Sequence, residues 1–179
     1  MTEVRLEPPN QALLPAYAAA LRTGWSPSNE QDVSAEHLAA IEADPDAFLA
    51  AFDWAPGQLT LAADGSMQPR LPGATFWITD GDFCGRINLR YVPGTVDLPP
   101  YATGHIGYAV VPWKRRQGIA TAALRLVLPF AYAQGLERVM ITSNPSNIAS
   151  HGVIRAVGGT FAGLRPNGTT LGFWVRTIP

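Results

Sequence analysis

One short stretch of this sequence constrains the fold more than any other. Residues 106–111 are apolar or small and rich in strand formers, whereas residues 120–128 favour a helix. Three adjacent cations, residues 114–116, and then Gly118 lie between them. A helix N-terminus presents about four unpaired backbone N–H groups, and glycine lets a ligand approach the backbone closely. The stretch therefore predicts a strand, a turn and a helix, and the turn is either a solvated basic connection or a phosphate-binding site.

Composition limits the classes of protein to be considered. The chain has 179 residues, of which 47% are hydrophobic, and this is enough for one folded domain. A net charge of -1 argues against a nucleic-acid-coating protein. Cys84 is the sole cysteine, no apolar run is long enough to span a membrane, and the first residues lack a signal-peptide pattern. We expect a cytoplasmic protein without nucleic-acid or membrane partners, and the single lysine among many arginines favours a bacterial genome rich in G and C.

The remaining sequence alternates between strand and helix patterns. Residues 53–73 contain several prolines and glycines and are expected to form mainly loop. Ser34 is expected to cap a helix that breaks near Asp44-Pro45, and Pro129 is expected to kink or break another. The expected helices are residues 13–21, 35–51, 118–134 and 147–157, and the expected strands are residues 4–7, 75–79, 83–91, 104–111, 138–142, 160–164 and 170–176.

A second motif follows the strand at 138–142. Asn147 and Ser150 stand three residues apart where the last helix begins, and the pair suits either a helix cap or a ligand contact. The two roles are compatible.

Together the motifs resemble the GNAT superfamily of N-acetyltransferases. The pattern Arg115-x-x-Gly118-x-Ala120 is similar to its pyrophosphate-binding signature. Residues 75–77, 85–90, 104–108 and 147–150 look like those of a bacterial group of uncharacterised acetyltransferases, so the resemblance covers about residues 75–175.

The resemblance implies an α/β (α+β) fold built on a mixed, mostly antiparallel sheet of six to seven strands with helices on both faces. One acetyltransferase domain would span residues 1–179, with an N-terminal strand and acceptor-side helices in 1–74 and an acetyl-CoA-binding core in 75–179. Strands 104–111 and 138–142 would run parallel and splay apart to admit the pantetheine arm.

The resemblance also implies a set of residues that bind acetyl-CoA as co-substrate, with no metal. Backbone groups on the strand would bond the pantetheine amides, N–H groups at the helix start would bind the pyrophosphate with help from two arginines, and the second motif would face the pantetheine end. These residues are Val110, Val111, Arg115, Arg116, Gln117, Gly118, Ile119, Ala120, Thr121, Asn147 and Ser150.

The implied reaction is direct attack of a primary amine on the acetyl group within a ternary complex. Many family members carry a tyrosine acid seven residues after the helix-opening asparagine, but this chain has Ile154 there. Ser150 is the candidate for stabilising the leaving thiolate. His105 is the candidate base because imidazole titrates near neutrality, and the alternative is a histidine satisfied at a strand end. Tyr108, on the opposite face of that strand from His105, is the third candidate catalytic residue.

Several alternatives stay open at this stage. A catalytically weak GNAT-fold protein that binds acyl-CoA or regulates a partner is the main rival, and the isoleucine at 154 favours it. The acceptor is a small-molecule amine or a peptide or protein N-terminus, and a homodimer is common in the family. A buried, structural Cys84 is expected rather than a nucleophile, and His151 is expected at the helix surface.

Overall fold

The computed structural model describes residues 3–29, 31–61 and 65–178, and the chain divides into two compact units. The first unit comprises Met1–Asp53, Ala74–Asn88 and Tyr108–Ala123. The second unit comprises Trp54–Gly73, Leu89–Gly107 and Leu124–Pro179. Each unit is assembled from segments that are distant in sequence.

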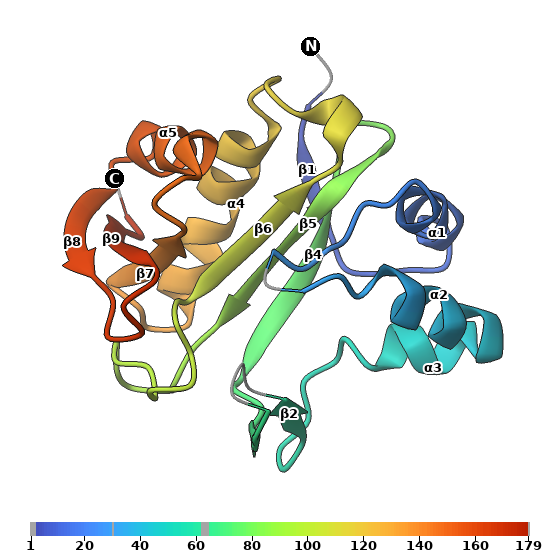
Figure 1. Cartoon of the computed structure of the whole chain (residues 1–179), viewed down its shortest axis with the longest axis horizontal. Coiled ribbons are helices and arrows are strands. Elements are labelled where there is room, and N and C mark those ends of the chain that lie inside the picture. Colours follow the sequence, from blue (N-terminus) through green and yellow to red (C-terminus); the bar gives the residue numbers. More distant parts are fainter. Residues whose placement is uncertain (1–2, 30, 62–64, 179) are drawn as a thin grey trace. The chain divides into compact units, whose positions relative to one another are not determined.

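Helices and strands follow one another in the mixed order expected for this chain (Figure 1). The helices are α1 (Leu14–Arg22), α2 (Ser34–Ala43), α3 (Pro45–Ala50), α4 (Ile119–Ala133) and α5 (Ile148–Ala156), together with the short 3₁₀ helix η1 (Pro112–Lys114). The strands are β1 (Arg5–Glu7), β2 (Leu59–Leu61), β3 (Met67–Pro69), β4 (Gly73–Thr79), β5 (Phe83–Arg90), β6 (Ile106–Val110), β7 (Arg138–Ser143), β8 (Thr160–Leu164) and β9 (Leu171–Arg176). No helix in the described part of the chain is both long and apolar enough to cross a membrane.

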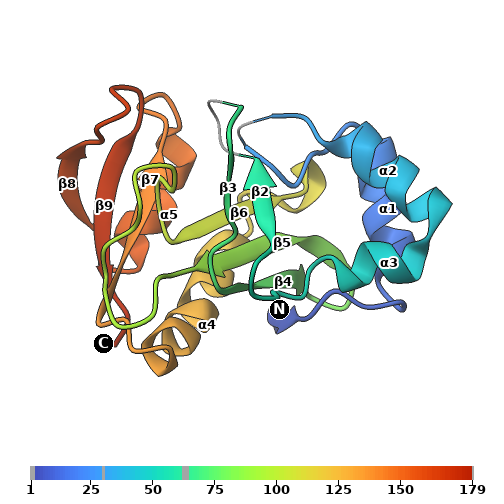
Figure 2. The ribbon, with the colours of Figure 1, turned by 90° about the horizontal axis from the view of Figure 1, so that it is seen from below.

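The described strands form three sheets. The largest has the order β1-β4-β5-β6 (Figure 1), a second has the order β7-β9-β8, and β2 pairs with β3 (Figure 2). β1 is antiparallel to β4, and β9 is antiparallel to both β7 and β8. The seven strands expected in one sheet are therefore present, but they form two sheets of four and three strands.

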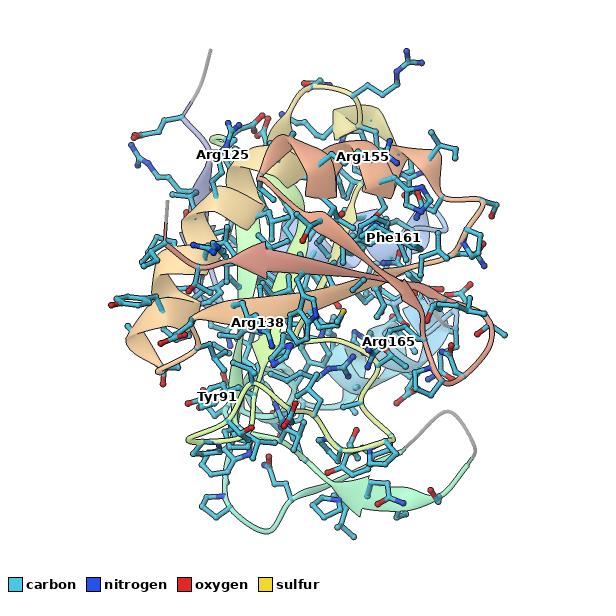
Figure 3. The ribbon with its side chains drawn as sticks, turned by 90° about the vertical axis from the view of Figure 1, so that its left-hand side faces the viewer. Tyr91, Arg125, Arg138, Arg155, Phe161 and Arg165 are labelled. Carbon is cyan, nitrogen blue, oxygen red and sulfur yellow. The ribbon has the colours of Figure 1, made fainter. Side chains whose placement is uncertain are left out.

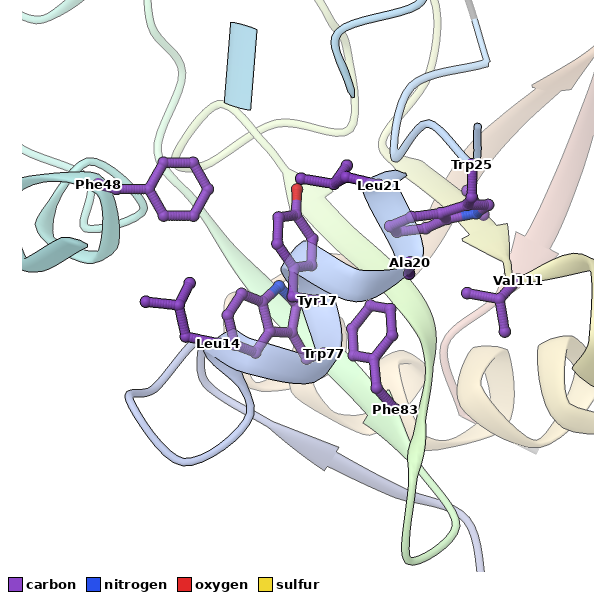
Figure 4. Packing of buried hydrophobic residues seen from close by; sticks show 10 residues of the cluster. Leu14, Tyr17, Ala20, Leu21, Trp25, Phe48, Trp77, Phe83 and Val111 are labelled. Atoms are coloured by element: carbon purple, nitrogen blue, oxygen red, sulfur yellow. The ribbon is translucent and has the colours of Figure 1, made fainter. Parts of the chain in front are cut away.

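Aromatic packing under α1 organises the first unit (Figure 4). Tyr17 stacks on Trp77 with ring centroids 4.8 Å apart, and the edge of Phe83 meets both rings. The Tyr17 hydroxyl lies 2.7 Å from Nδ1 of His37, which gives the buried phenol a partner. Burial raises the pKa of Tyr17 and lowers the pKa of His37, so both side chains are neutral at pH 7. This cluster fixes α1 against β4 and β5.

The second unit is held by the β7-β9-β8 ladder and by α5 (Figure 3). The Arg138 guanidinium lies 4.3 Å from the centroid of the Trp174 ring, a cation–π contact between paired strands. Thr177 donates a 2.6 Å hydrogen bond to the Leu136 carbonyl and fixes the end of the chain beside the start of β7.

The local expectations can be compared with the structure one by one. The described residues of 53–73 are mainly loop, as expected, and they also contain the short antiparallel pair β2–β3, which tolerates a proline at its end. Ser34 is the first residue of α2 rather than its cap. Pro129 lies inside α4, which is not broken there and continues for four more residues, because the φ of proline is compatible with a helix; a kink at Pro129 stays a prediction. The expected break at Asp44-Pro45 is confirmed, and Asp44 caps α3 by accepting a hydrogen bond from Ala47 N–H.

The hairpin that carries β5 depends on Gly85. A Cβ atom there would lie 2.2 Å from the Ala109 carbonyl oxygen, and the residue has a φ of 149°. We expect Gly85→Ala to lower the free energy of unfolding by about 2 kcal/mol or more. In α5, Gly152→Ala meets no atom within 4 Å and should stabilise the protein by about 0.5–1 kcal/mol. Urea denaturation measures both, and equal effects of the two variants would contradict this account.

Candidate functional site

The turn between β6 and α4 has an unusual backbone. The 3₁₀ helix η1 leads into Arg115, which is extended, and then into Arg116, which has a φ of 60°. Arg116 is the only non-glycine residue with positive φ among those the structure describes. Gly118 has a φ of 80°, and a Cβ there would meet no atom within 4 Å. Left-handed residues that alternate with right-handed ones turn successive N–H groups toward one side of the chain.

This backbone leaves a row of hydrogen-bond donors without acceptors. The first helical bond of α4 runs from Ala122 N–H to the Gly118 carbonyl, at 2.9 Å. No hydrogen bond among described residues starts from the N–H groups of residues 117–121. The side chains of Arg115 and Arg116 beside them are exposed. The turn therefore fits an anion with several oxygen atoms, such as a pyrophosphate.

Lys114 is engaged elsewhere. Its ammonium group donates 2.8 Å hydrogen bonds to both carboxylate oxygens of Asp80 in the β4–β5 turn and lies 3.7 Å from Asp82. The hydrogen bond to Asp80 raises the pKa of Lys114 and lowers that of Asp80. Of the three adjacent cations, Arg115 donates from Nε to the Val110 carbonyl at 3.0 Å, and both arginines expose their side chains at the turn.

The end of β6 partly matches the expected contacts with a pantetheine arm. Val111 N–H donates to the Cys84 carbonyl at 3.0 Å, and the Val111 carbonyl accepts from Lys114 N–H. Both backbone groups of Val111 are thus used inside the protein, which disfavours the predicted role for this residue. Val110 is the neighbour that faces away from β5, because alternate residues of a strand direct their backbone groups to opposite edges.

His105 lies just before β6 and is completely buried. Its backbone N–H donates to the Met140 carbonyl at 2.7 Å, and the Nδ1 atom of its ring accepts from the Met140 backbone N–H at 2.9 Å. The ring proton is therefore on Nε2, which has no partner among the described residues. Burial lowers the pKa of His105 to about 4. These contacts favour the alternative of a structural histidine over the general base.

The second motif begins α5 as expected. Asn147 is the N-cap, and its Oδ1 accepts a 3.1 Å hydrogen bond from Ser150 N–H. The capping interpretation is confirmed, whereas a ligand contact of this exposed asparagine stays a prediction. Ser150 is half-buried. Ile154 is fully buried and packs on Gly159. Its hydrocarbon side chain cannot donate a proton in place of the tyrosine that many family members carry at this position.

Two other reactive side chains are structural. Cys84 is buried, and its thiol donates to the Asp82 carbonyl at 3.4 Å. Burial raises the pKa of Cys84 to about 12, which disfavours a nucleophile. His151, expected at the surface of α5, is instead buried, with Nε2 3.2 Å from the Asn144 carbonyl and its ring against Phe173. No group of residues that could hold a metal ion is found in the described ranges.

The predicted site residues are distributed over both units. Tyr108, Val110 and the turn at residues 115–121 belong to the first unit, whereas His105, Asn147 and Ser150 belong to the second. No sequence motif marks Asn29, whose side-chain amide donates a 2.8 Å hydrogen bond to the Tyr108 carbonyl. Its partner is 79 residues away, so no local pattern could have identified the contact.

The buried imidazole of His105 makes stability depend on pH. Its pKa is about 4 in the folded chain and about 6.5 when unfolded, so only the unfolded chain gains a proton between these values. The free energy of unfolding should fall by at most about 3 kcal/mol as pH drops from 7 to 4. We expect a shallower loss in His105→Gln, whose amide oxygen can still accept from Met140 N–H. Urea denaturation between pH 7 and 4.5 checks this, and equal slopes for the two proteins would contradict it.

Comparisons with known proteins agree with this geometry. The family model described as acetyltransferase (GNAT) domain matches residues 5–160. No curated protein matches the sequence.

Solved structures with the same fold include three acetyltransferases bound to coenzyme A or acetyl-CoA. RimJ from Mycobacterium smegmatis, in complex with CoA-disulfide, has a TM-score of 0.64 and 24% identity, over 97% of this chain and 81% of RimJ. RimL, a ribosomal alpha-N-protein acetyltransferase in complex with coenzyme A, has a TM-score of 0.58 and 15% identity, over 98% of this chain and 94% of RimL. MccE, a Microcin C7 self-immunity acetyltransferase in complex with acetyl-CoA and AMP, has a TM-score of 0.58 and 13% identity, over 98% of this chain and 93% of MccE.

These similarities confirm the expected mixed α/β fold. Since the family model spans most of its length, the chain belongs to the GNAT family of N-acetyltransferases.

Proposed function

We propose that this chain transfers an acetyl group from acetyl-CoA to a primary amine by direct attack within a ternary complex. The acceptor is a small molecule or the N-terminus of a peptide or protein. The observation that carries the proposal is the row of N–H groups at residues 117–121, which have no acceptor among described residues. Complexes of RimJ, RimL and MccE with coenzyme A or acetyl-CoA support the choice of co-substrate.

The turn before α4 supplies the binding energy for the nucleotide end of acetyl-CoA. Its N–H groups donate to the pyrophosphate oxygens, and Gly118 adopts the φ of 80° that the turn requires without strain. Arg115 and Arg116 add positive charge at an exposed position.

The acetyl end is aligned by the free edge of β6. Val110 presents its backbone N–H at this edge, where it can donate to a carbonyl of the bound arm. An N–H group held by a strand needs no reorganisation as negative charge develops on the thioester oxygen. Tyr108, half-buried on the same strand, is the side chain proposed to contact the reacting amine.

The reaction forms a C–N bond and breaks the C–S bond of the thioester. The amine attacks in its neutral form and loses a proton to solvent as the tetrahedral intermediate collapses. The departing thiolate accepts a hydrogen bond from the Ser150 hydroxyl, directly or through water, and takes up its proton from solvent. Asn147 positions Ser150 through the hydrogen bond to its backbone N–H.

A second function competes with this one. Ile154 occupies the place of the tyrosine acid found in many relatives, and its side chain is fully buried. This favours a protein that binds acyl-CoA and regulates a partner with little catalysis of its own. Such a protein would bind acetyl-CoA but would release no coenzyme A thiol when amines are added.

The pyrophosphate site can be tested by calorimetric titration with acetyl-CoA. We expect micromolar binding by the wild type and a loss of about 100-fold or more in the double variant Arg115→Ala/Gly118→Asp, which removes one cation and places an anion among the N–H donors. Arg125→Ala is the matched control, because this exposed arginine on α4 bonds the Ala156 carbonyl in the second unit. Equal affinity of the double variant and the wild type would overturn the site.

The role of Ser150 can be tested separately from binding. Ser150→Ala should keep the affinity for acetyl-CoA and lower kcat by about 10- to 100-fold, because it removes the donor to the thiolate. Ser150→Thr keeps a hydroxyl and should restore part of the rate. Unchanged kcat in Ser150→Ala, measured from the release of coenzyme A thiol, would remove Ser150 from the mechanism.

A further inference from the structure

β6 is the last strand in the order β1-β4-β5-β6, so one of its edges has no partner strand among the residues that the structure describes. The bond from Val111 N–H to the Cys84 carbonyl shows which residues face β5. The backbone groups of successive residues point to opposite edges of a strand, so Tyr108 and Val110 direct their carbonyl groups to the free edge.

Side chains of the protein already occupy both of these carbonyls. Asn29 Nδ2 donates to the Tyr108 oxygen at 2.8 Å, and Arg115 Nε donates to the Val110 oxygen at 3.0 Å. An extended ligand that adds to a strand edge bonds the same groups with its own amides. The two side chains therefore stand where N–H groups of such a ligand would be.

Asn29 lies in the connection between α1 and α2, of which the structure describes residues 24–29 and 31–33. The segment is anchored near its start by the buried side chain of Trp25. Ser26 Oγ accepts hydrogen bonds from the N–H groups of Ser28 and Val33, at 3.3 and 3.2 Å. Asn29 itself is exposed, so its amide can exchange the Tyr108 carbonyl for water at little cost in solvation.

We propose that Asn29 is a displaceable strap on the free edge of β6, and that the amide-bearing arm of acetyl-CoA replaces its hydrogen bond to the Tyr108 carbonyl. This inference rests on the proposed function. Binding of the co-substrate then frees the Asn29 side chain from the Tyr108 carbonyl. The strap thereby couples co-substrate binding to the segment between α1 and α2, within the part of the chain proposed to face the acceptor.

The proposal predicts that removing the strap strengthens co-substrate binding. Asn29→Ala should bind acetyl-CoA about two- to tenfold more tightly than the wild type, the range expected when one competing hydrogen bond is lost. ADP carries a pyrophosphate but no amide-bearing arm, so both proteins should bind it equally. Asn29→Asp should resemble Asn29→Ala because it cannot donate to a carbonyl. Asn167→Asp is the matched control, since its Oδ1 accepts from backbone N–H groups in the second unit.

Hydrogen exchange gives a second, independent measurement. Acetyl-CoA should speed amide exchange in residues 24–29 of the wild type, whereas it should leave exchange of the same segment in Asn29→Ala nearly unchanged. If the wild type binds acetyl-CoA but Asn29→Ala binds it equally or more weakly, or if the segment becomes more protected, the strap is wrong and the proposed function survives. If the wild type binds no acetyl-CoA, both proposals are overturned.

Discussion

The left-handed backbone at Arg116 and Gly118 is the constraint on which the candidate site depends. A strand that passed directly into a helix would direct its first N–H groups along the helix axis. Here two residues with positive φ follow η1, and α4 begins with donors that no described residue accepts from. Gly118 adopts this conformation without strain, whereas Arg116 adopts it at a cost that surrounding contacts must offset. Lys114 supplies one such contact by fixing the turn to Asp80.

The free edge of β6 connects this turn to the acetyl end of the proposed site. A strand edge offers alternating donors and acceptors at fixed spacing, so it aligns an extended ligand with little loss of entropy on the protein side. The carbonyls of Tyr108 and Val110 are already bonded by Asn29 and Arg115. Side chains of the protein thus bond two carbonyl groups at this edge, which leaves fewer of its backbone groups unpaired.

Local patterns were readable from the sequence, and long-range contacts were not. Gly118 and the Asn147 cap could be identified because each depends on a few adjacent residues. The alternation of strands and helices after residue 75 could be identified in the same way. The β2–β3 pair could not, because the prolines and glycines of residues 53–73 favour a loop. The hydrogen bond between His105 and Met140 spans 35 residues, and it turns a candidate base into a buried structural group. The contact between Asn29 and Tyr108 spans 79 residues and has no signal in any short window.

The central claim is that this GNAT chain catalyses acetyl transfer from acetyl-CoA to an amine, and release of coenzyme A thiol tests it most directly. The purified chain would be incubated with acetyl-CoA and a panel of small amines and peptides with free N-termini, and mass spectrometry would identify the product. We predict thiol release that depends on at least one acceptor, with equal amounts of acetylated amine, and its loss in Arg115→Ala/Gly118→Asp. Tight acetyl-CoA binding with no acceptor-dependent release would contradict the claim and would indicate an acyl-CoA-binding protein instead.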